Sequence, residues 1–462
     1  MSIFNEWFPV QNSRKQSVDE MLQWVSDRRK AVSVDINFTS LDKMTQWSYN
    51  STSSAIVHES GKFFSIGGLA VEDFQGNKKA WSQPIIIQPE VGILGCLVKK
   101  INGVYYALVQ AKIEPGNVNH VQLSPTVQAT RSNFTRIHKG RYPRYLEYFQ
   151  QNPNCQILVD QLQSEQGTRF LHKRNRNVII EVFEDVPEHD DYRWVSIADL
   201  KILINMDNLI NMDLRSVLSA LPVNEICSAE SKRDAVSHCG NAFLASAIYV
   251  TDTRELNNTI MWLSKLRSEQ SLKLSYPRLD ELSDWKLTGD GIYHTDNKFF
   301  EIKWCKITIG NREVTEWDQP LVAPCERAIS ALFVTKIDGI LKFLVQAKSE
   351  IGLLDGPQLT PTISISPSSY DNIYSDIEFY EFFEKYDDKK IIYDSLQSEE
   401  GGRFYQESNR YMIIEVANDL YDNFRRSHNF KWVSLNTLLS LMRHTNFLSI
   451  QLRTLLAKVE YI

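Results

Sequence analysis

The chain has 462 residues, 43% hydrophobic and 23% charged, which is typical of a globular protein with room for two domains. Its net charge of −6 and its pI of about 5.9 do not favour binding to nucleic acids or other long polyanions. Six scattered cysteines without a CxxC pair predict reduced thiols and no structural metal, and the absence of a leader-like start or a long apolar span predicts a cytoplasmic protein.

Polar and apolar segments recur along the chain in the same order. Gln110-Ala111-Lys112 returns 236 residues later as Gln346-Ala347-Lys348, and QSEQGTRF returns as QSEEGGRF. Packing alone would preserve only the apolar pattern, so the recurrence predicts a tandem duplication. We expect an N-terminal repeat at 1–222, a linker segment at 223–252 and a C-terminal repeat at 253–462. The apolar part of the linker segment should pack on one of the domains.

Each repeat is predicted to open with a helix, because apolar residues follow helical spacing at 18–25 and at 260–266. Aromatic strands around 58–64 and 294–300 come next. A hairpin then follows in each repeat, with Asn102-Gly103 and Asp338-Gly339 at the turns, since both dipeptides suit the positive φ values of a type I′ turn.

The second part of each repeat begins with a short aromatic helix, at 145–149 and 379–383. A strand follows at 178–182 and 412–416, and an apolar-periodic helix closes the repeat at 214–221 and 452–459. This order of elements predicts an α+β unit with a mixed sheet and flanking helices.

Polar side chains alternate in the segment that follows Gln110, Lys112 and a turn at 114–117. On an extended backbone they would all point to one face, which suits a polyhydroxylated ligand, although an edge strand with a solvent face gives the same pattern. The alternating residues are Gln122, Ser124, Thr126, Gln128 and Thr130.

A second polar segment is rich in donors and precedes an apolar strand. Guanidinium groups and lysine suit a diphosphate, while a solvated basic loop is the structural alternative. Only Arg169, Asn175 and Arg176 of its basic part recur in the second repeat, which favours ligand binding by the others. The segment contains Gln163, Ser164, Glu165, Arg169, Lys173, Arg174, Asn175 and Arg176.

Two further residues are candidates for acid–base chemistry. Glu181 lies in an apolar strand, which favours a structural ion pair with Arg176 over catalysis, and His120 lies in the polar segment of the first repeat only. We find no Gly-rich dinucleotide fingerprint, P-loop or HExxH motif, so we expect no cofactor and no metal.

The segments VQAKIEPGNVNHVQLSPTVQATRSN, YPRYLEYF, QSEQGTRF and KRNRN, in this order and spacing, strongly resemble the NDP-hexose 2,3-dehydratases of deoxysugar biosynthesis. The resemblance covers both repeats. It implies a tandem of two Nudix-like domains and a homodimer. The Nudix hydrolase signature is absent from both repeats, which disfavours phosphate hydrolysis at a carboxylate-held Mg²⁺.

The resemblance also implies cofactor-independent loss of water from dTDP-4-keto-6-deoxyglucose, giving a 3,4-diketo sugar for an NADPH-dependent 3-ketoreductase. The diphosphate would bind Arg169 and the residues from Lys173 to Arg176, and the thymine would stack on an aromatic residue such as Trp81. The base stays open among four residues, with Ser124 or Thr126 as a possible relay. The four are Lys112, His120, Glu165 and Glu181.

The second repeat should hold a degenerate or ancillary pocket, because His120, Gln128, Lys173 and Arg174 become Gly356, Ser364, Glu407 and Ser408. The candidate residues of this pocket are Trp317, Lys348, Gln358, Thr360, Thr362, Gln397, Ser398, Arg403, Asn409 and Arg410. Two other functions remain as alternatives, a diphosphate hydrolase of the Nudix type and a nucleotide-sugar binding protein without catalysis.

Overall fold

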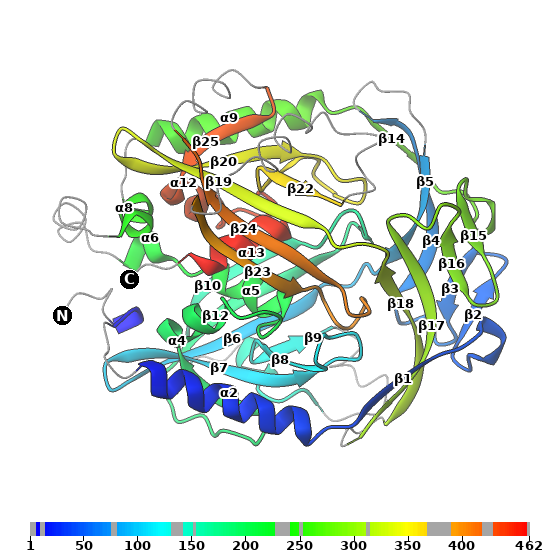
Figure 1. Ribbon diagram of the computed structural model, residues 1–462, viewed down its shortest axis with the longest axis horizontal. Helices are drawn as coiled ribbons and strands as arrows, with labels where there is room; N and C mark the ends of the chain where they lie inside the picture. The colour runs from blue at the N-terminus through cyan, green and yellow to red at the C-terminus, as the bar shows by residue number, and fades with distance from the viewer. Residues whose placement is uncertain are drawn as a thin grey trace.

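A computed structural model describes residues 6–9, 14–74, 81–130, 142–150, 154–226, 241–248, 253–310, 315–366, 390–417 and 428–459. These residues form four β-sheets and several helices, an α+β arrangement (Figure 1). Each repeat contributes one large sheet, and two smaller sheets are shared between the repeats.

The large sheet of the N-terminal repeat is mixed. Its strands, in spatial order, are β10 (Cys155–Ser164), β12 (Arg174–Val182), β6 (Gly92–Ile101), β7 (Val104–Ile113) and β13 (Tyr192–Ser196). β12 runs parallel to β6, and the other pairs are antiparallel. The φ angles of Asn102 and Gly103 are 50° and 83°, which confirms the predicted turn of the hairpin.

The large sheet of the C-terminal repeat has the same plan. Its strands are β21 (Gln358–Thr360), β20 (Ile340–Lys348), β19 (Ile329–Ile337), β24 (Ser408–Glu415) and β23 (Ile391–Ser398), with β22 (Ile363–Ile365) on β19 and β25 (Phe430–Ser434) on β20. β24 is parallel to β19, as β12 is to β6. The second aromatic helix, expected at 379–383, lies outside the described residues.

The alternating polar segment does not form one continuous strand, so the prediction of a single polar face is wrong. β8 (Val121–Ser124) pairs with β7, whereas β9 (Val127–Ala129) pairs with β6, and Pro125 separates them. Thr126 fills the gap: its hydroxyl accepts the Leu97 N–H at 2.9 Å and donates to the Leu108 carbonyl. Thr362 makes the same two contacts in the other repeat.

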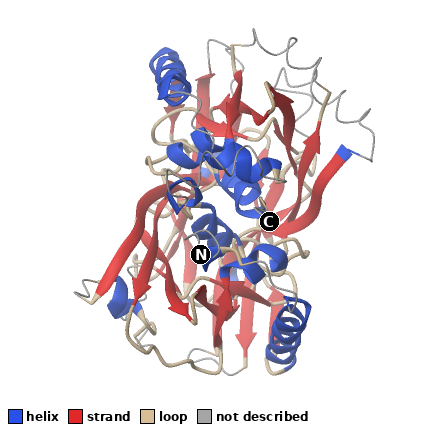
Figure 2. Cartoon of the chain, turned by 90° about the vertical axis from the view of Figure 1, so that its left-hand side faces the viewer, coloured by secondary structure: helices blue, strands red, loops and turns tan. Residues whose placement is uncertain are grey.

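Short helices lie between the two large sheets, and longer ones lie at opposite ends of the molecule (Figure 2). The helices are α2 (Arg14–Lys30), α4 (Ile197–Leu203), α5 (Met212–Ser219), α6 (Val223–Ile226), α8 (Ala242–Ile248), α9 (Thr253–Glu269), α12 (Leu435–Leu441) and α13 (Ile450–Lys458). Asn211 caps α5 and Ser449 caps α13, each accepting a backbone N–H three residues on. No helix among the described residues is long and apolar enough to cross a membrane.

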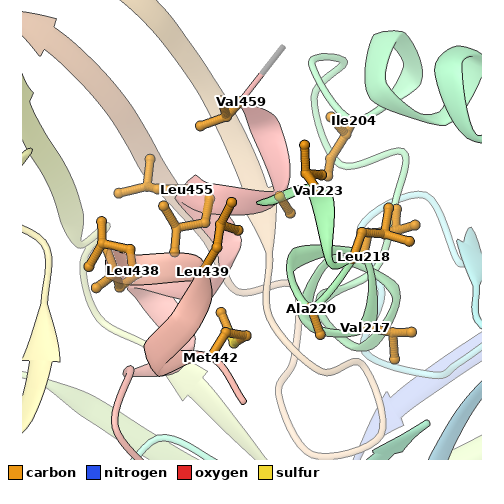
Figure 3. Close-up of a cluster of buried hydrophobic side chains, with 14 of the residues drawn as sticks. Ile204, Val217, Leu218, Ala220, Val223, Leu438, Leu439, Met442, Leu455 and Val459 are labelled. Atoms are coloured by element: carbon orange, nitrogen blue, oxygen red, sulfur yellow. The ribbon is translucent and has the colours of Figure 1, made fainter. Parts of the chain in front are cut away.

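The hydrophobic core is continuous between the repeats. α5 packs against α13, and Val217 and Leu218 lie in one cluster with Leu439 and Leu455 (Figure 3). Within the linker segment, α8 packs on α12 and β20, and Ser246 of α8 donates to the Leu341 carbonyl at 2.6 Å.

Each of the two smaller sheets contains one strand that comes from the other repeat. One consists of β11 (Phe170–Leu171), β5 (Trp81–Ile87), β4 (Ser65–Phe74), β3 (Ala55–His58) and β2 (Trp47–Asn50), with β14 (Leu272–Ser275) on β4; the other consists of β1 (Val34–Phe38), β17 (Phe300–Ile309), β16 (Gly291–His294), β15 (Trp285–Leu287) and β18 (Glu316–Pro324). β14 comes from the C-terminal repeat, and β1 comes from the N-terminal repeat (Figure 1). Each repeat therefore completes a sheet of the other.

Candidate active site

Two loops clasp the repeats together. The Gly116 N–H donates to the Gly401 carbonyl at 2.8 Å, and the Gly352 N–H donates to the Gly167 carbonyl at 2.8 Å. The backbones approach so closely that a Cβ on Gly116 would lie 1.7 Å from the Phe404 carbonyl oxygen. Only glycine fits such a contact. The clasp brings the turn within the QSE…RF segment of each repeat, at 163–170 and 397–404, beside the turn that follows the hairpin of the other repeat.

The clasp assembles two clusters of charged side chains, each built by both repeats. The Lys173 cluster consists of Glu114, Asn117, Gln128, Glu165, Lys173, Asn175 and Asp213 from the N-terminal repeat and Glu400, Arg403 and Arg453 from the C-terminal repeat. The Arg169 cluster consists of Lys348, Glu350, Glu399, Glu407, Asn409 and Tyr411 from the C-terminal repeat and Gln166, Arg169 and Arg215 from the N-terminal repeat.

The arginines of the two turns are exchanged between the clusters. Arg403 donates to the Gln88 side chain at 3.2 Å, and its guanidinium lies 4.3 Å from the ring centroid of Phe64, both in the N-terminal repeat. Arg169 stacks in the same way on Phe300, at 4.1 Å. The order of residues in the sequence grouped Arg169 with Lys173 and assigned Arg403 to the second pocket. In the structure, Arg403 lies in the Lys173 cluster and Arg169 lies in the other cluster, because the clasp brings each turn to the other repeat.

The KRNRN segment is also divided, because from Arg174 onward it belongs to β12 and not to a loop before it. Lys173 and Asn175 are buried, whereas Arg174 and Arg176 are partly exposed on the opposite face. Arg176 pairs with Asp160 at 2.6 Å, so the predicted pair with Glu181 is wrong. Glu181 accepts a hydrogen bond from the Tyr105 hydroxyl at 2.9 Å.

Glu399 and Glu165 occupy equivalent positions but have different surroundings. Glu399 accepts hydrogen bonds from Asn409 at 2.8 Å, Tyr411 at 3.0 Å and Gln166 at 2.5 Å, so both of its oxygens are satisfied. Glu165 accepts one bond, from Asn175 at 2.7 Å, and its Oε2 is buried with no hydrogen-bond partner among the described residues.

The substitutions between the repeats explain this difference. Gln166, which donates to Glu399, corresponds to Glu400 in the Lys173 cluster, and the Glu400 side chain makes no hydrogen bond to the Glu165 Oε2. Tyr411 corresponds to Asn177, whose side chain is engaged by Ser216 at 3.0 Å. The Lys173 cluster therefore has a buried carboxylate oxygen, the open oxygen of Glu165, that has no hydrogen-bond partner among the described residues.

The charges of the Lys173 cluster shift one another's proton affinities. Burial raises the pKa of Glu400 to about 7; Arg403 opposes this increase, and the charges of Glu165 and Glu114 add to it. Burial also raises the pKa of Glu165 and that of Asp213, and it lowers the pKa of Lys173. A carboxyl group that titrates near neutrality beside a second carboxylate is an arrangement suited to acid–base chemistry.

Most of the repeated amides and hydroxyls hold the repeats together. Ser398 donates to Gln122 at 2.7 Å, and Ser164 donates to Gln358 at 2.9 Å. The Gln163 and Gln397 side chains donate to backbone carbonyls of Met442 and Ile204. The buried Arg215 and Arg453, which sequence reasoning missed, donate to the Ser398 and Ser164 carbonyls at 2.6 and 2.7 Å.

The other candidates of the N-terminal repeat have varied positions. Gln128 donates to Glu114 at 2.8 Å, and Gln110 donates to Asp191 at 3.0 Å. Lys112 lies opposite Gln122 in the sheet, and its charge lowers the pKa of Asp213, against the larger effect of burial. His120 has a φ of 63°, and burial lowers its pKa. Ser124 donates to the Pro125 carbonyl, and Thr130 and Trp81 are partly exposed.

The remaining candidates of the C-terminal repeat make mainly local contacts. Lys348 donates to the Ser364 carbonyl at 2.5 Å, and Trp317 donates to the Gln319 side chain at 2.9 Å. Thr360 donates to the Pro361 carbonyl, and Arg410 pairs with Asp394 at 2.5 Å.

Sequence reasoning missed Glu114, Asn117, Asp213 and Glu400. A signal for Glu400 was available, since it is the place where QSEQG becomes QSEEG. In the described part of the chain, no group of three or more His, Cys, Asp or Glu side chains is arranged to hold a metal ion.

Paired carboxyl groups beside a buried lysine are groups that can transfer protons. Comparison with known proteins gives the family. The sequence model of the NDP-hexose 2,3-dehydratases matches the chain twice, over residues 18–221 and 256–459, and the chain belongs to this family.

Three relatives carry the same name, dTDP-4-dehydro-6-deoxy-alpha-D-glucopyranose 2,3-dehydratase. The protein from Saccharopolyspora spinosa is 39% identical over 95% of this chain and 90% of its own length. The protein from Amycolatopsis orientalis is 35% identical over 96% and 90%, and that from Streptomyces violaceoruber is 35% identical over 95% and 96%.

Proposed function

We propose that this chain is a lyase that removes water across C2 and C3 of dTDP-4-keto-6-deoxyglucose and forms a 3,4-diketo-2,6-dideoxy sugar nucleotide. Its family and the names of its relatives support the reaction class and the substrate. The observation that carries the site assignment is the contrast between Glu165, with its open oxygen, and the fully hydrogen-bonded Glu399.

We assign Glu165 as the base and Glu400 as the acid. Glu165 removes the C3 hydrogen as a proton, which the C4 carbonyl makes acidic, and the electron pair forms an enolate. When the enolate collapses, a C2–C3 double bond forms and the C2–O bond breaks, and protonated Glu400 supplies the proton that converts the leaving hydroxide to water. Lys173 and Arg403 provide positive charge for the enolate.

The product of this elimination is an enol with a hydroxyl group on C3. Ionised Glu400 takes the proton of that hydroxyl, and protonated Glu165 returns a proton to C2, which gives the 3-ketone. Both carboxyl groups then have their starting protonation states. The proposed cycle uses side chains from both repeats, since Glu165 comes from the first and Glu400 from the second.

The same proposal includes the fold class of the repeats, the assembly of the protein and the enzyme that uses its product. We assign each repeat to the Nudix-like class on its mixed sheet with flanking helices, and we assign the active protein as a homodimer whose product goes to an NADPH-dependent 3-ketoreductase. Binding of the diphosphate by Arg174 stays a prediction, and Arg174→Ala tests it through KM.

The test is a paired substitution. In an assay coupled to a 3-ketoreductase and NADPH, Glu165→Gln should lower kcat by about 10²- to 10⁴-fold, the usual contribution of a general base. Glu399→Gln is the matched control and should remain active, with its fold checked by melting temperature. Equal activity of Glu165→Gln and the parent protein would exclude Glu165 as the base. Release of a nucleoside monophosphate from the substrate would favour a diphosphate hydrolase.

A further inference from the structure

Asn117 lies in the clasp with an unpaired side chain. It is 1% exposed, and neither its Nδ2 nor its Oδ1 has a hydrogen-bond partner among the described residues. Its backbone is satisfied, because its N–H donates to the Glu114 carbonyl at 3.2 Å and its carbonyl accepts the His120 N–H at 3.0 Å. A buried amide without partners is costly, so such a side chain calls for an explanation.

The amide lies against the turn that contains Glu400 of the Lys173 cluster. Its Oδ1 is 2.2 Å from the point where a Cβ of Gly401 would lie. At the next residue, Gly402, the corresponding point lies 3.1 Å from an oxygen of Glu400 and 3.7 Å from an oxygen of Glu114. Asn117 and Glu400 therefore line adjacent positions of one turn.

The other repeat shows that the fold does not need an amide here. The residue equivalent to Asn117 is Leu353, which packs on Gly167 in the same manner: a Cβ on Gly167 would lie 2.8 Å from the Leu353 Cγ. Leucine fills the position without leaving a polar atom unpaired. The amide is thus particular to the cluster that has the open Glu165 oxygen.

We propose that Asn117 binds the α-hydroxy ketone of the substrate, donating from Nδ2 to the C4 carbonyl oxygen and accepting the C3 hydroxyl at Oδ1. An amide presents a donor and an acceptor side by side, and an α-hydroxy ketone presents the complementary acceptor and donor. The bond from Nδ2 strengthens as charge develops on the carbonyl oxygen in the enolate, so Asn117 contributes to catalysis and to recognition of the sugar. This assignment rests on the proposed dehydratase reaction.

The test uses the full chain and the two equivalent positions. Asn117→Leu should lower kcat and kcat/KM together by about 10²- to 10³-fold, the usual effect of removing a donor to an oxyanion. The affinity for dTDP, measured by calorimetry, should not change, because the proposal places the amide against the sugar and not against the nucleotide. The melting temperature should stay the same or rise, because an unpaired polar group is removed. The matched control, Leu353→Asn, should keep full turnover.

Several outcomes would overturn the assignment. Full activity in a folded Asn117→Leu protein would mean that a buried water satisfies the amide. A fall in dTDP affinity equal to the fall in kcat/KM would give Asn117 a role in the nucleotide site or in the fold. If the Asn117→Leu protein does not fold, Asn117→Ser replaces it and the same quantities are measured. The serine hydroxyl is too short to contact both oxygens of the substrate. Failure of the parent protein to convert the keto sugar would instead refute the dehydratase proposal itself.

Discussion

Single residues distinguish the two clusters, although the backbone around them is alike. Lys173 has Glu407 as its equivalent, Asn117 has Leu353, and Glu400 has Gln166. Each exchange changes a charge or a hydrogen-bonding group without changing the backbone contacts of the clasp. The charges and hydrogen-bonding groups of the Lys173 cluster therefore depend on side chains that the Arg169 cluster lacks.

At neutral pH the rate should depend on the protonation of Glu400. With a pKa of about 7 and a role as acid, Glu400 loses its proton as the pH rises, so kcat should fall above about pH 7. Glu114→Gln removes a negative charge that raises this pKa, so the fall should move to lower pH. The pH profile of kcat measures this shift, and Glu350→Gln, the equivalent change in the Arg169 cluster, should leave the profile unchanged.

Glu407 should make stability depend on pH. Burial raises its pKa to about 7, above the ordinary value of 4.5, so its contribution to stability is complete below the unfolded pKa and is lost as the pH rises through 7. Glu407→Gln cannot titrate. The melting temperature of the Glu407→Gln protein, relative to that of the parent protein, should therefore rise between pH 5 and pH 8. Parallel melting curves over this range would show that Glu407 is not protonated in the folded state.

The composition of the Lys173 cluster was only partly predictable from sequence. Glu165, Gln128, Lys173 and Asn175 were singled out because they are polar residues near repeated motifs. Arg403 and Glu400 belong to the other repeat, and the clasp that brings them across depends on close backbone contacts at Gly116 and Gly352. Linear order contains no direct signal for a contact of this kind.

At the scale of elements, Thr126 and Thr362 each form hydrogen bonds to two neighbouring strands of a large sheet. Thr126→Val leaves the buried Leu97 N–H without its acceptor and should lower the free energy of unfolding by about 1–3 kcal/mol. Thr362→Val should cost a similar amount through Phe333. Because the two sites lie in different sheets, the costs should add in the double variant, as measured by urea unfolding. A neutral Thr126→Val would show that the N–H finds another partner.

The regular elements were largely predictable. The hairpins, the opening helices and the closing helices follow from apolar periodicity and from the Asn-Gly and Asp-Gly turns. Two features differ from the sequence-based expectation: the break between β8 and β9 at Pro125, and the start of β12 at Arg174 inside the KRNRN segment. Alternating polar residues predict one continuous strand, and a run of basic residues predicts a loop. In both cases the tertiary partners of a strand, which local pattern does not show, decided the outcome.

At the scale of the whole molecule, the exchanged strands β1 and β14 make each repeat dependent on the other. The segments 1–222 and 253–462, produced separately, should each lack one strand of a small sheet and part of a charged cluster. We expect neither to unfold cooperatively as a monomer, and we expect co-expression of the two to restore turnover. A cooperative thermal transition of monomeric 1–222 would contradict this dependence.

The reciprocal exchange of strands and arginines also indicates how the protein arose. A single unit without its duplicate can make these contacts only with a second copy of itself, so a single-repeat ancestor would need to be a strand-swapped pair with two identical clusters. Joining two such units in one chain would make the swap intramolecular and leave one of the two clusters free to change. Glu407 and Leu353 are differences of this kind in the Arg169 cluster, whereas the Lys173 cluster combines a carboxyl group from each repeat, Glu165 and Glu400.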